Sequence, residues 1–163
     1  MQRACYTKAV AVLTEEDDVR VPMKVDYGVR ALVDLAERLG EGPVQASEVA
    51  ARQNVPEPYL DQLLTTLQKF GFVRSRRGPQ GGHTLARAPE EVTLGMVFAS
   101  LEGTAAPLEC IDEPGECSLS DTCAQRDVWR TVDEAVQSLL SATSIADLMT
   151  RQRQRVSGGV YQI

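Results

Sequence analysis

The stretch SEVAARQNVPEPYLDQLLTTLQKFGFVRSRRGPQGGH, residues 47–83, decides the fold. It begins with a short amphipathic segment over 47–53, and the tight connection Asn54-Val55-Pro56 follows. Leucines at positions 60, 63, 64 and 67 then recur at helical spacing and predict a second helix over 57–70. Gly71 is the residue type that commonly ends a helix. A short helix, a tight turn and a longer helix predict a helix-turn-helix.

The residues after Gly71 predict a β-hairpin. Short runs over 72–75 and 83–86 indicate two strands, and the Gly- and Pro-rich segment 77–82 supplies the turn between them. A helix-turn-helix with a hairpin behind it is a winged helix-turn-helix. We therefore expect a mainly α fold with a small β-hairpin wing.

Further helices are expected on both sides of this unit. Apolar residues recur at intervals of three and four from Val25 to Leu39, and the segment 40–43 ends that helix with glycine and proline. Thr93 predicts the N-cap of a helix that runs to Leu101. Ser144, with Asp147 three residues later, predicts the start of a last short helix.

A long helix is expected after Cys123. It would span about 18 residues, or roughly 27 Å. One face carries an apolar stripe made of Val128, Val132, Ala135, Val136, Leu139 and Leu140. This face is larger than the small core can cover, which predicts a dimerisation helix and a homodimer.

The chain of 163 residues divides into five segments by these patterns. We expect a poorly ordered extension over 1–22, a winged helix-turn-helix DNA-binding domain over 23–103, a cysteine loop over 104–123, the dimerisation helix and short last helix over 124–156, and a frayed tail over 157–163.

The overall charge argues against nucleic-acid binding, but its distribution does not. There are 17 Lys and Arg against 23 Asp and Glu, a formal charge of -6. Residues 44–87 nevertheless hold six basic side chains against three acidic ones, whereas residues 88–125 hold eight acidic and no basic ones. The predicted wing is therefore locally basic, as contact with phosphates requires.

The start of the second helix and the wing are the candidate DNA contacts. In such units the second helix enters the major groove with its first residues at the base edges, which here are Glu57, Tyr59, Asp61 and Gln62. The wing would bring Arg74, Arg76, Arg77 and Gly78 to the phosphates or a narrow minor groove. The alternative is that Tyr59 packs on the core and that the arginines only protect a hairpin edge. Some winged helices also bind proteins instead of DNA.

Three of the four cysteines lie close together in the sequence. Six residues separate Cys110 from Cys117, and five separate Cys117 from Cys123. Three thiolates and one open position suit an iron–sulfur cluster with a different fourth ligand, or a zinc ion. The spacing lacks the close Cys-x-x-Cys pair of common zinc sites, which favours the cluster. The alternatives are buried small side chains or a redox pair. Cys5 is expected to have no role.

Compartment and activity class follow from absences in the sequence. No apolar run approaches the roughly 18 residues of a membrane span, and no signal peptide is present, which predicts a cytoplasmic protein with reduced thiols. We find no Ser/His/Asp set, phosphate loop or paired carboxylates, so no enzyme is expected.

Three motifs resemble one family of bacterial regulators. They are MKVDYGVRAL from Met23, YLDQLL from Tyr59 and RGPQGGH from Arg77. Together they resemble the Rrf2 family of winged-helix transcriptional regulators, which includes the iron–sulfur regulators IscR and NsrR, over about 23–151. The family usually has Tyr where this chain has His83. The resemblance implies a homodimer on a palindromic operator, with Tyr59, Asp61 and Gln62 reading bases and Arg77 in the minor groove.

The resemblance also implies a 2Fe-2S or 4Fe-4S cluster held by the three cysteines. Relatives commonly space them five and five, so this chain carries one extra residue. One relative uses a His three residues after its last Cys, where this chain has Arg126, which cannot ligate. Another uses an Asp of the partner's first helix, which makes Asp26 the candidate fourth ligand; alternatively, Asp26 only complements the helix dipole.

The expected function is a dimeric repressor whose DNA binding responds to the cluster, and thereby to iron–sulfur status, redox state or nitric oxide. Two alternatives remain: a protein-interaction module, or a cluster-free regulator with structural, zinc-bound or redox-active cysteines.

Overall fold

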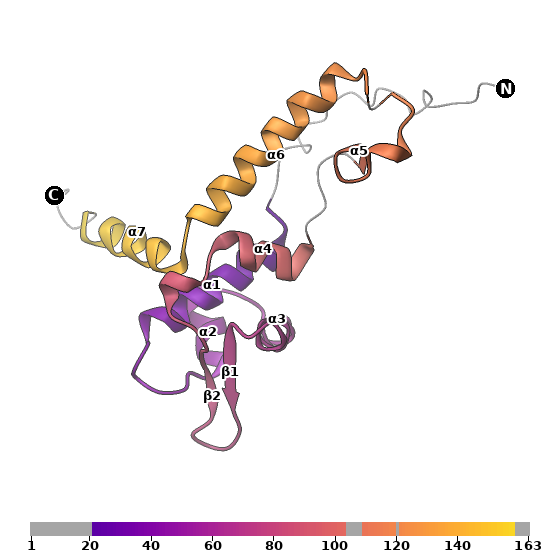
Figure 1. Ribbon diagram of the computed structural model, residues 1–163. Coiled ribbons are helices and arrows are strands. Elements are labelled where there is room, and N and C mark those ends of the chain that lie inside the picture. Colours follow the sequence, from indigo (N-terminus) through magenta and orange to yellow (C-terminus); the bar gives the residue numbers. More distant parts are fainter. Residues whose placement is uncertain (1–20, 104–108, 120, 159–163) are drawn as a thin grey trace.

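The computed structural model describes residues 21–103, 109–119 and 121–158 (Figure 1). Cys5 and most of the extension expected over 1–22 lie outside these residues, as does the end of the tail over 159–163. In chain order the elements are α1 (Met23–Glu37), α2 (Ala46–Gln53), α3 (Glu57–Lys69), β1 (Val73–Arg76), β2 (Gly82–Leu85), η1 (Pro89–Glu91), α4 (Leu94–Glu102), α5 (Glu109–Asp112), η2 (Pro114–Glu116), α6 (Ala124–Ala142) and α7 (Ile145–Gly158).

Helix α1 lies at the centre of the helical core. It contacts α2, α3, α4 and α7, and its Leu32 is fully buried. Leu60, Leu64 and Leu67 meet it from α3, as the helical spacing predicts. Leu39, expected on the inner face, is instead 57% exposed because α1 ends at Glu37 before reaching it. The mainly helical fold with a two-stranded hairpin confirms the predicted fold class.

The turn of the helix-turn-helix depends on Asn54. This residue adopts a left-handed conformation with φ 52°, which Asn tolerates better than most residues. The amide of Val55 donates to the Ala50 carbonyl at 3.0 Å and closes the end of α2. Pro56 then precedes the first turn of α3 and accepts hydrogen bonds from the Tyr59 and Leu60 amides. The start of α3 is thereby set directly against the end of α2.

The wing is an antiparallel hairpin in which Val73 faces Leu85 and Arg76 faces Gly82. Strand β1 begins one residue later than predicted, because the Phe72 amide donates to the Leu67 carbonyl at the end of α3. Strand β2 begins and ends one residue earlier than predicted, with its last residue, Leu85, opposite Val73. Val44 and His83 exchange backbone hydrogen bonds of 2.9 and 2.7 Å, which ties β2 of the wing to the segment before α2. Gly82 is required there, since a Cβ atom would lie 2.4 Å from the Val44 carbonyl oxygen.

Helix α6 runs away from this core and has no buried residue in the single chain (Figure 1). Its apolar stripe is open to solvent, with Val128 63% and Leu139 68% exposed. The surplus apolar face expected from the sequence is therefore present. At the far end of α6, residues 109–116 form α5 and η2 within what was expected to be an irregular loop (Figure 1).

Helix α7 begins as predicted and ends later. Ser144 Oγ and the Asp147 amide form a capping bond of 3.1 Å, and Asp147 accepts from the Ser144 amide at 2.8 Å. The Ser144 hydroxyl also donates to the Asp147 carboxylate, at 2.7 Å, and this bond together with the one from the Ser144 amide lowers the pKa of Asp147. The helix is 14 residues long and ends at Gly158, two residues after Val156, so it is not the short helix that the sequence predicted. Within the described ranges, no helix combines the length and the apolar character that a membrane span needs.

Candidate nucleic-acid interface and cysteine loop

The first turns of α3 present polar side chains to solvent. Glu57, Asp61 and Gln62 are all exposed. The backbone carbonyls of Asp61 and Gln62 accept hydrogen bonds from the Thr65 and Thr66 hydroxyls, at 2.8 and 3.0 Å. Both threonine hydroxyls are therefore hydrogen-bonded within the helix. Asp61 and Gln62, which are predicted to read bases, are therefore adjacent residues whose side chains are open to solvent near the start of α3.

Tyr59 differs from these neighbours because its ring is partly buried. The ring meets Tyr27 of α1 edge to face, with centroids 5.8 Å apart. Arg30 lies over Tyr27, with its guanidinium carbon 5.6 Å from the ring centroid. The Tyr59 ring therefore fixes α3 against α1, as the packing alternative expected, and base reading by this residue stays a prediction.

The wing carries the exposed arginines that the sequence placed there. Arg74, Arg76 and Arg77 are exposed, and none has a carboxylate within ion-pair distance among the described residues. Gly78 has φ 111°, a conformation that favours glycine, and lets the chain turn directly after Arg77. Three uncompensated guanidinium groups on a narrow hairpin form a surface suited to phosphates.

A chain of side-chain hydrogen bonds joins α3 to both strands of the wing. Ser75 Oγ donates to Gln68 Oε1 at 2.9 Å and lies 2.9 Å from His83 Nδ1. Because Ser75 gives its one proton to Gln68, it accepts from His83 Nδ1–H. Burial lowers the pKa of His83, and the nearby Asp61 charge opposes that shift. The sequence analysis placed His83 in the predicted wing but did not predict this contact with Ser75.

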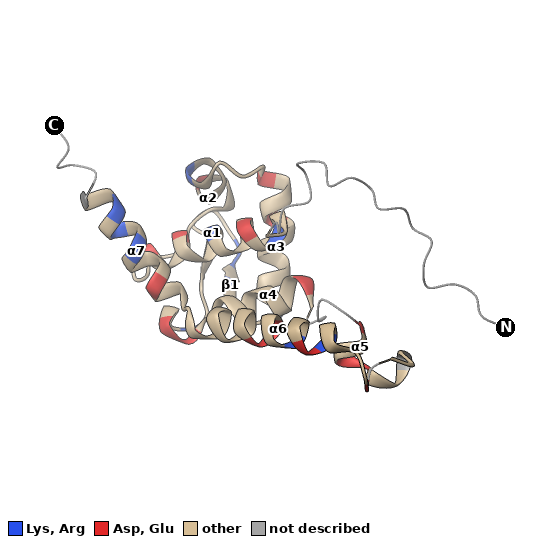
Figure 2. Cartoon of the chain, turned by 90° about the horizontal axis from the view of Figure 1, so that it is seen from above, with Lys and Arg blue, Asp and Glu red and all other residues tan. Residues whose placement is uncertain are grey.

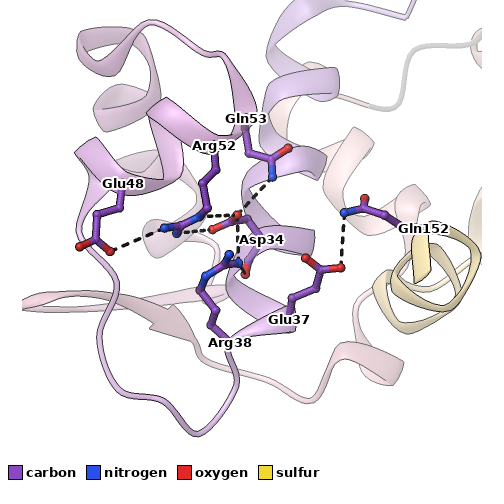
Figure 3. Close-up of polar contacts among 7 residues, drawn as sticks. All are labelled: Asp34, Glu37, Arg38, Glu48, Arg52, Gln53 and Gln152. Carbon is purple, nitrogen blue, oxygen red and sulfur yellow. Dashed lines mark hydrogen bonds and ion pairs between the residues drawn. The ribbon is translucent and has the colours of Figure 1, made fainter. Parts of the chain in front are cut away.

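A buried ionic cluster fixes α2 to α1 (Figure 3). Asp34 is 1% exposed and accepts two hydrogen bonds from Arg52, at 3.0 and 2.8 Å, and a third from Gln53 at 3.2 Å. Arg38 lies 3.1 Å from the same carboxylate. The hydrogen bond to Asp34 raises the pKa of Arg52. The sequence analysis missed Asp34, although the i,i+4 spacing of Asp34 and Arg38 is a visible signal.

The three clustered cysteines all belong to the segment that leads into α6. Cys110 lies in α5, Cys117 directly follows η2, and Cys123 precedes the first residue of α6. All three are free thiols of intermediate exposure. Arg126 occupies the position where a His ligand was considered, and its Nε donates to the Cys110 carbonyl at 2.8 Å. This arginine connects the cysteine segment to the start of α6.

The donor set fits an iron–sulfur cluster in chemistry, because three free thiols occur in one segment. The described part of a single chain does not bring three Cys, His, Asp or Glu donors into one metal-ready group. Asp26, the candidate fourth ligand, lies on α1 and pairs with Arg30 at 2.8 Å. To hold a cluster, the cysteine segment would therefore have to bring its three thiols together, and a fourth donor would have to come from elsewhere.

Comparisons with known proteins identify the family. The sequence model of the Rrf2 family, described as an iron-dependent transcriptional regulator, matches residues 21–151. CymR of Bacillus subtilis is 32% identical over 130 residues, covering 80% of this chain and 89% of CymR. IscR of Aliivibrio salmonicida is 33% identical over 140 residues, covering 85% of this chain and 83% of IscR.

Solved structures agree with the sequence comparison. The structure of CymR, described as the global cysteine regulator of B. subtilis, is similar with a TM-score of 0.70 and 31% identity, covering 82% of this chain and 98% of that one. IscR of T. potens has a TM-score of 0.68 and 36% identity, with 82% and 88% covered. The chain belongs to the Rrf2 family of DNA-binding transcriptional regulators, a family of regulators and not of enzymes.

Proposed function

We propose that this chain is a homodimeric repressor whose DNA binding responds to an iron–sulfur cluster held by Cys110, Cys117 and Cys123. The observation that carries the proposal is the position of three free thiols in the segment that leads into α6, in the same chain as a winged helix with a basic wing. Family membership supports DNA binding but does not decide the cofactor, because IscR binds a cluster and CymR does not.

The reading surface would combine α3 and the wing. Glu57, Tyr59, Asp61 and Gln62 would face base edges in the major groove, with Tyr59 contributing its hydroxyl because its ring packs on Tyr27. The wing residues would follow the backbone or enter the minor groove, and these are Arg74, Arg76, Arg77 and Gly78. The hydrogen-bonded chain through Ser75 supports this arrangement, because it holds the wing at a fixed position beside α3.

The dimer would form through α6. A helix of 19 residues with no buried side chain and a continuous apolar stripe is unfavourable in water. A second copy would cover the stripe by an isologous contact about a twofold axis. Two reading helices related by this axis predict a palindromic operator with half-sites about one helical turn apart.

The fourth cluster ligand would come from Asp26 of the other subunit. Within one chain Asp26 is only partly exposed and already has Arg30 as a partner. The role of the chain's residues in sensing would be to hold the cluster by three thiolates and one oxygen donor, and to bias the dimer geometry. The cluster itself would supply the reactivity toward iron loss, oxidants or nitric oxide.

Two measurements on the full chain test the proposal. Selection from a random duplex library should enrich a palindrome, with affinity falling steeply as salt rises. Anaerobic reconstitution with ferrous iron and sulfide should give visible absorption that the triple Cys110→Ala, Cys117→Ala, Cys123→Ala variant lacks. No palindrome would contradict the reading surface, and a colourless wild type would contradict the cluster.

One observation favours a second candidate. The described part of the chain has no ready metal group, and CymR belongs to the same family. A cluster-free regulator would use the same wing and α3, with thiol oxidation as its signal. A protein that stays colourless yet changes its DNA affinity on mild oxidation would identify this candidate.

A further inference from the structure

We propose that the acidic cysteine segment of one subunit docks into a basic pocket between α1 and α7 of its partner. The inference rests on the homodimer proposed above and adds the surface that receives the cysteine segment. The occupant is therefore a second copy of this chain, recognised by charge.

The pocket lies where α7 crosses α1 and holds about 360 Å³. Its polar wall consists of Arg30, Arg151, Arg155, Gln53 and Gln152. Arg30 pairs with Asp26, but Arg155 has no carboxylate within ion-pair distance in the described part of the chain. Arg151 lies one turn after Asp147 without reaching ion-pair distance. The pocket therefore holds more positive than negative charge in a chain that is acidic overall.

A groove that is apolar apart from Asp26 continues from this pocket, and Val29 and Leu148 line both. The groove holds about 460 Å³ and includes Val136 and Leu140 from the C-terminal half of α6. Along this face the surface thus changes from apolar at α6 to basic at α7. An occupant that fits both parts must carry an apolar segment beside an acidic one.

The chain itself contains such a segment. Five acids and no bases occur over 109–121, and the exposed apolar residues Val128, Trp129 and Val132 follow on α6. Glu109, Glu113 and Asp121 are exposed, and no base lies within ion-pair distance of them among the described residues. Their order along the chain, acidic and then apolar, matches the order of the pocket and the groove.

The segment cannot reach the pocket of its own chain. It lies at the N-terminal end of α6, whereas α7 starts at the C-terminal end, and the 19 residues between span about 28 Å. In Figure 2 the red segments that mark acidic residues around α5 and the blue segments that mark basic residues on α7 lie at opposite ends of the molecule. The two charged regions can meet only between subunits.

An antiparallel pairing of two α6 helices would bring them together. It places the first turns of one α6 on the groove formed by Val136 and Leu140 of the other. The cysteine segment, which precedes those turns, then extends past Leu148 toward Arg151 and Arg155. Charge complementarity at both ends would select this orientation over a parallel one.

The docked segment would contact α1, the helix that also positions α2 and α3 of the helix-turn-helix. Arg30 lines the pocket from α1, and one turn further along α1 Asp34 fixes α2. Closure of the cysteine segment around a bound group would change what α1 contacts. The proposed sensor and the reading helix therefore share one rigid element.

Charge reversal tests the docking in the full-length, metal-free, reduced protein. The Arg151→Glu/Arg155→Glu variant should raise the dimer dissociation constant about tenfold at roughly 0.05 M salt, and the difference should shrink at about 0.5 M. Arg153→Glu, on the same helix but outside the pocket, should leave the constant unchanged. Adding Glu109→Arg and Glu113→Arg to the double variant should restore the dimer. Unchanged dissociation in the double variant, or no restoration, would overturn the docking.

A cross-link locates the contact and does not depend on those substitutions being tolerated. A photoreactive amino acid at position 155 should cross-link to a peptide from 109–121, and mixed dimers of isotopically heavy and light chains should show that the link joins two subunits. Links to other peptides, to DNA or within one chain would refute the docking while leaving the dimer in place. A wild-type chain that sediments as a monomer would refute the dimer as well, so the two failures are distinguishable.

Discussion

Arg52 of α2 binds Asp34 of α1 through two hydrogen bonds, at 3.0 and 2.8 Å, and so fixes the first helix of the helix-turn-helix to the centre of the core. Asp34 is 1% exposed, whereas Arg52 remains one-third exposed. A buried carboxylate that loses its partner keeps its desolvation cost, so this pair determines whether α2 stays in place.

The Arg52→Ala variant should therefore unfold more easily than the wild type. Removing one partner of a fully buried pair costs about 3–5 kcal/mol, and the exposure of Arg52 together with the remaining Arg38 contact should reduce this to roughly 2 kcal/mol. Urea denaturation followed by circular dichroism measures the change. Glu48→Gln, which removes only the 3.8 Å contact between Glu48 and Arg52, should cost about 0.5 kcal/mol or less. Equal losses in the two variants would contradict this account.

The pH dependence of stability should report the state of His83, the one histidine of the chain. Its pKa is lowered in the folded protein from an ordinary value near 6.5, mainly by burial. The unfolded chain therefore binds a proton first as pH falls, and stability that is present above pH 6.5 is lost as pH drops through the lowered value. The free energy of unfolding should decline in this window and stay level just above it.

The matched variant for this prediction is His83→Gln, which keeps a polar partner for Ser75 but cannot titrate. Its unfolding free energy should vary less between about pH 5 and pH 7 than that of the wild type. Urea denaturation of both proteins at several pH values in this range measures the difference in unfolding free energy. An equally steep decline in the variant would assign the effect to other groups.

The wing arginines should contribute affinity and salt dependence more than sequence preference. Arg77→Ala should weaken binding to all duplexes and reduce the slope of log affinity against log salt by about one. Gln62→Ala should instead relax the base preference at one position of each half-site, a change of about 1–3 kcal/mol. Fluorescence anisotropy on matched and mutated operators separates the two effects. Arg130→Ala, on α6 and away from the wing, is the control and should change neither quantity.

The sequence predicted those features that depend on local spacing. The leucines of α3, the Thr93 cap and the Ser144–Asp147 capping bond are set by residues within one or two helical turns, and the structure confirms them. Strand β1 begins one residue later than predicted because the Phe72 amide bonds to Leu67, a choice between two local partners that periodicity does not resolve. Leu39 was wrongly predicted to be buried because its spacing fits the helical pattern, whereas α1 ends at Glu37.

The contacts that assemble the site were harder to predict. Asp34 and Arg52 are 18 residues apart, and Ser75 meets Gln68 and His83 only once the hairpin has folded against α3. A polar residue in an amphipathic helix does not reveal from the sequence whether its partner lies on another element. The basic pocket could not be predicted for the same reason, since Arg30 and Arg151 are distant in sequence.

The α6 stripe should control the oligomeric state. Val132→Asp places a charge at the middle of the apolar face, where Val132 is 42% exposed in the single chain, and would bury that charge in a dimer. Sedimentation velocity should show a monomer at concentrations where the wild type is a dimer, with helical content retained. Gln137→Asp, on the opposite face of α6, should remain dimeric. A dimeric Val132→Asp protein would move the interface elsewhere.

Cluster retention should depend on Asp26 only through the partner subunit. Asp26→Ala should leave the three thiolate donors and the dimer intact but shorten the lifetime of a reconstituted cluster, because a site that loses one protein ligand exposes that corner to solvent. Loss of visible absorbance under an iron chelator measures the lifetime. Since Asp26 also pairs with Arg30, Arg30→Ala serves as the control: it removes the same ion pair while keeping the carboxylate. At about 0.5 M salt, where the charge-dependent docking at Arg30 is screened, the cluster should persist in this variant. Equal loss in both variants would mean that the ion pair, and not ligation, supports the site. Mixed dimers of Asp26→Ala chains with triple-cysteine variant chains keep Asp26 only on the subunit opposite the intact thiolates, so their cluster should last as long as that of wild-type chains paired with the triple-cysteine variant. A shorter lifetime in the mixed dimer that carries Asp26→Ala would exclude ligation across the interface.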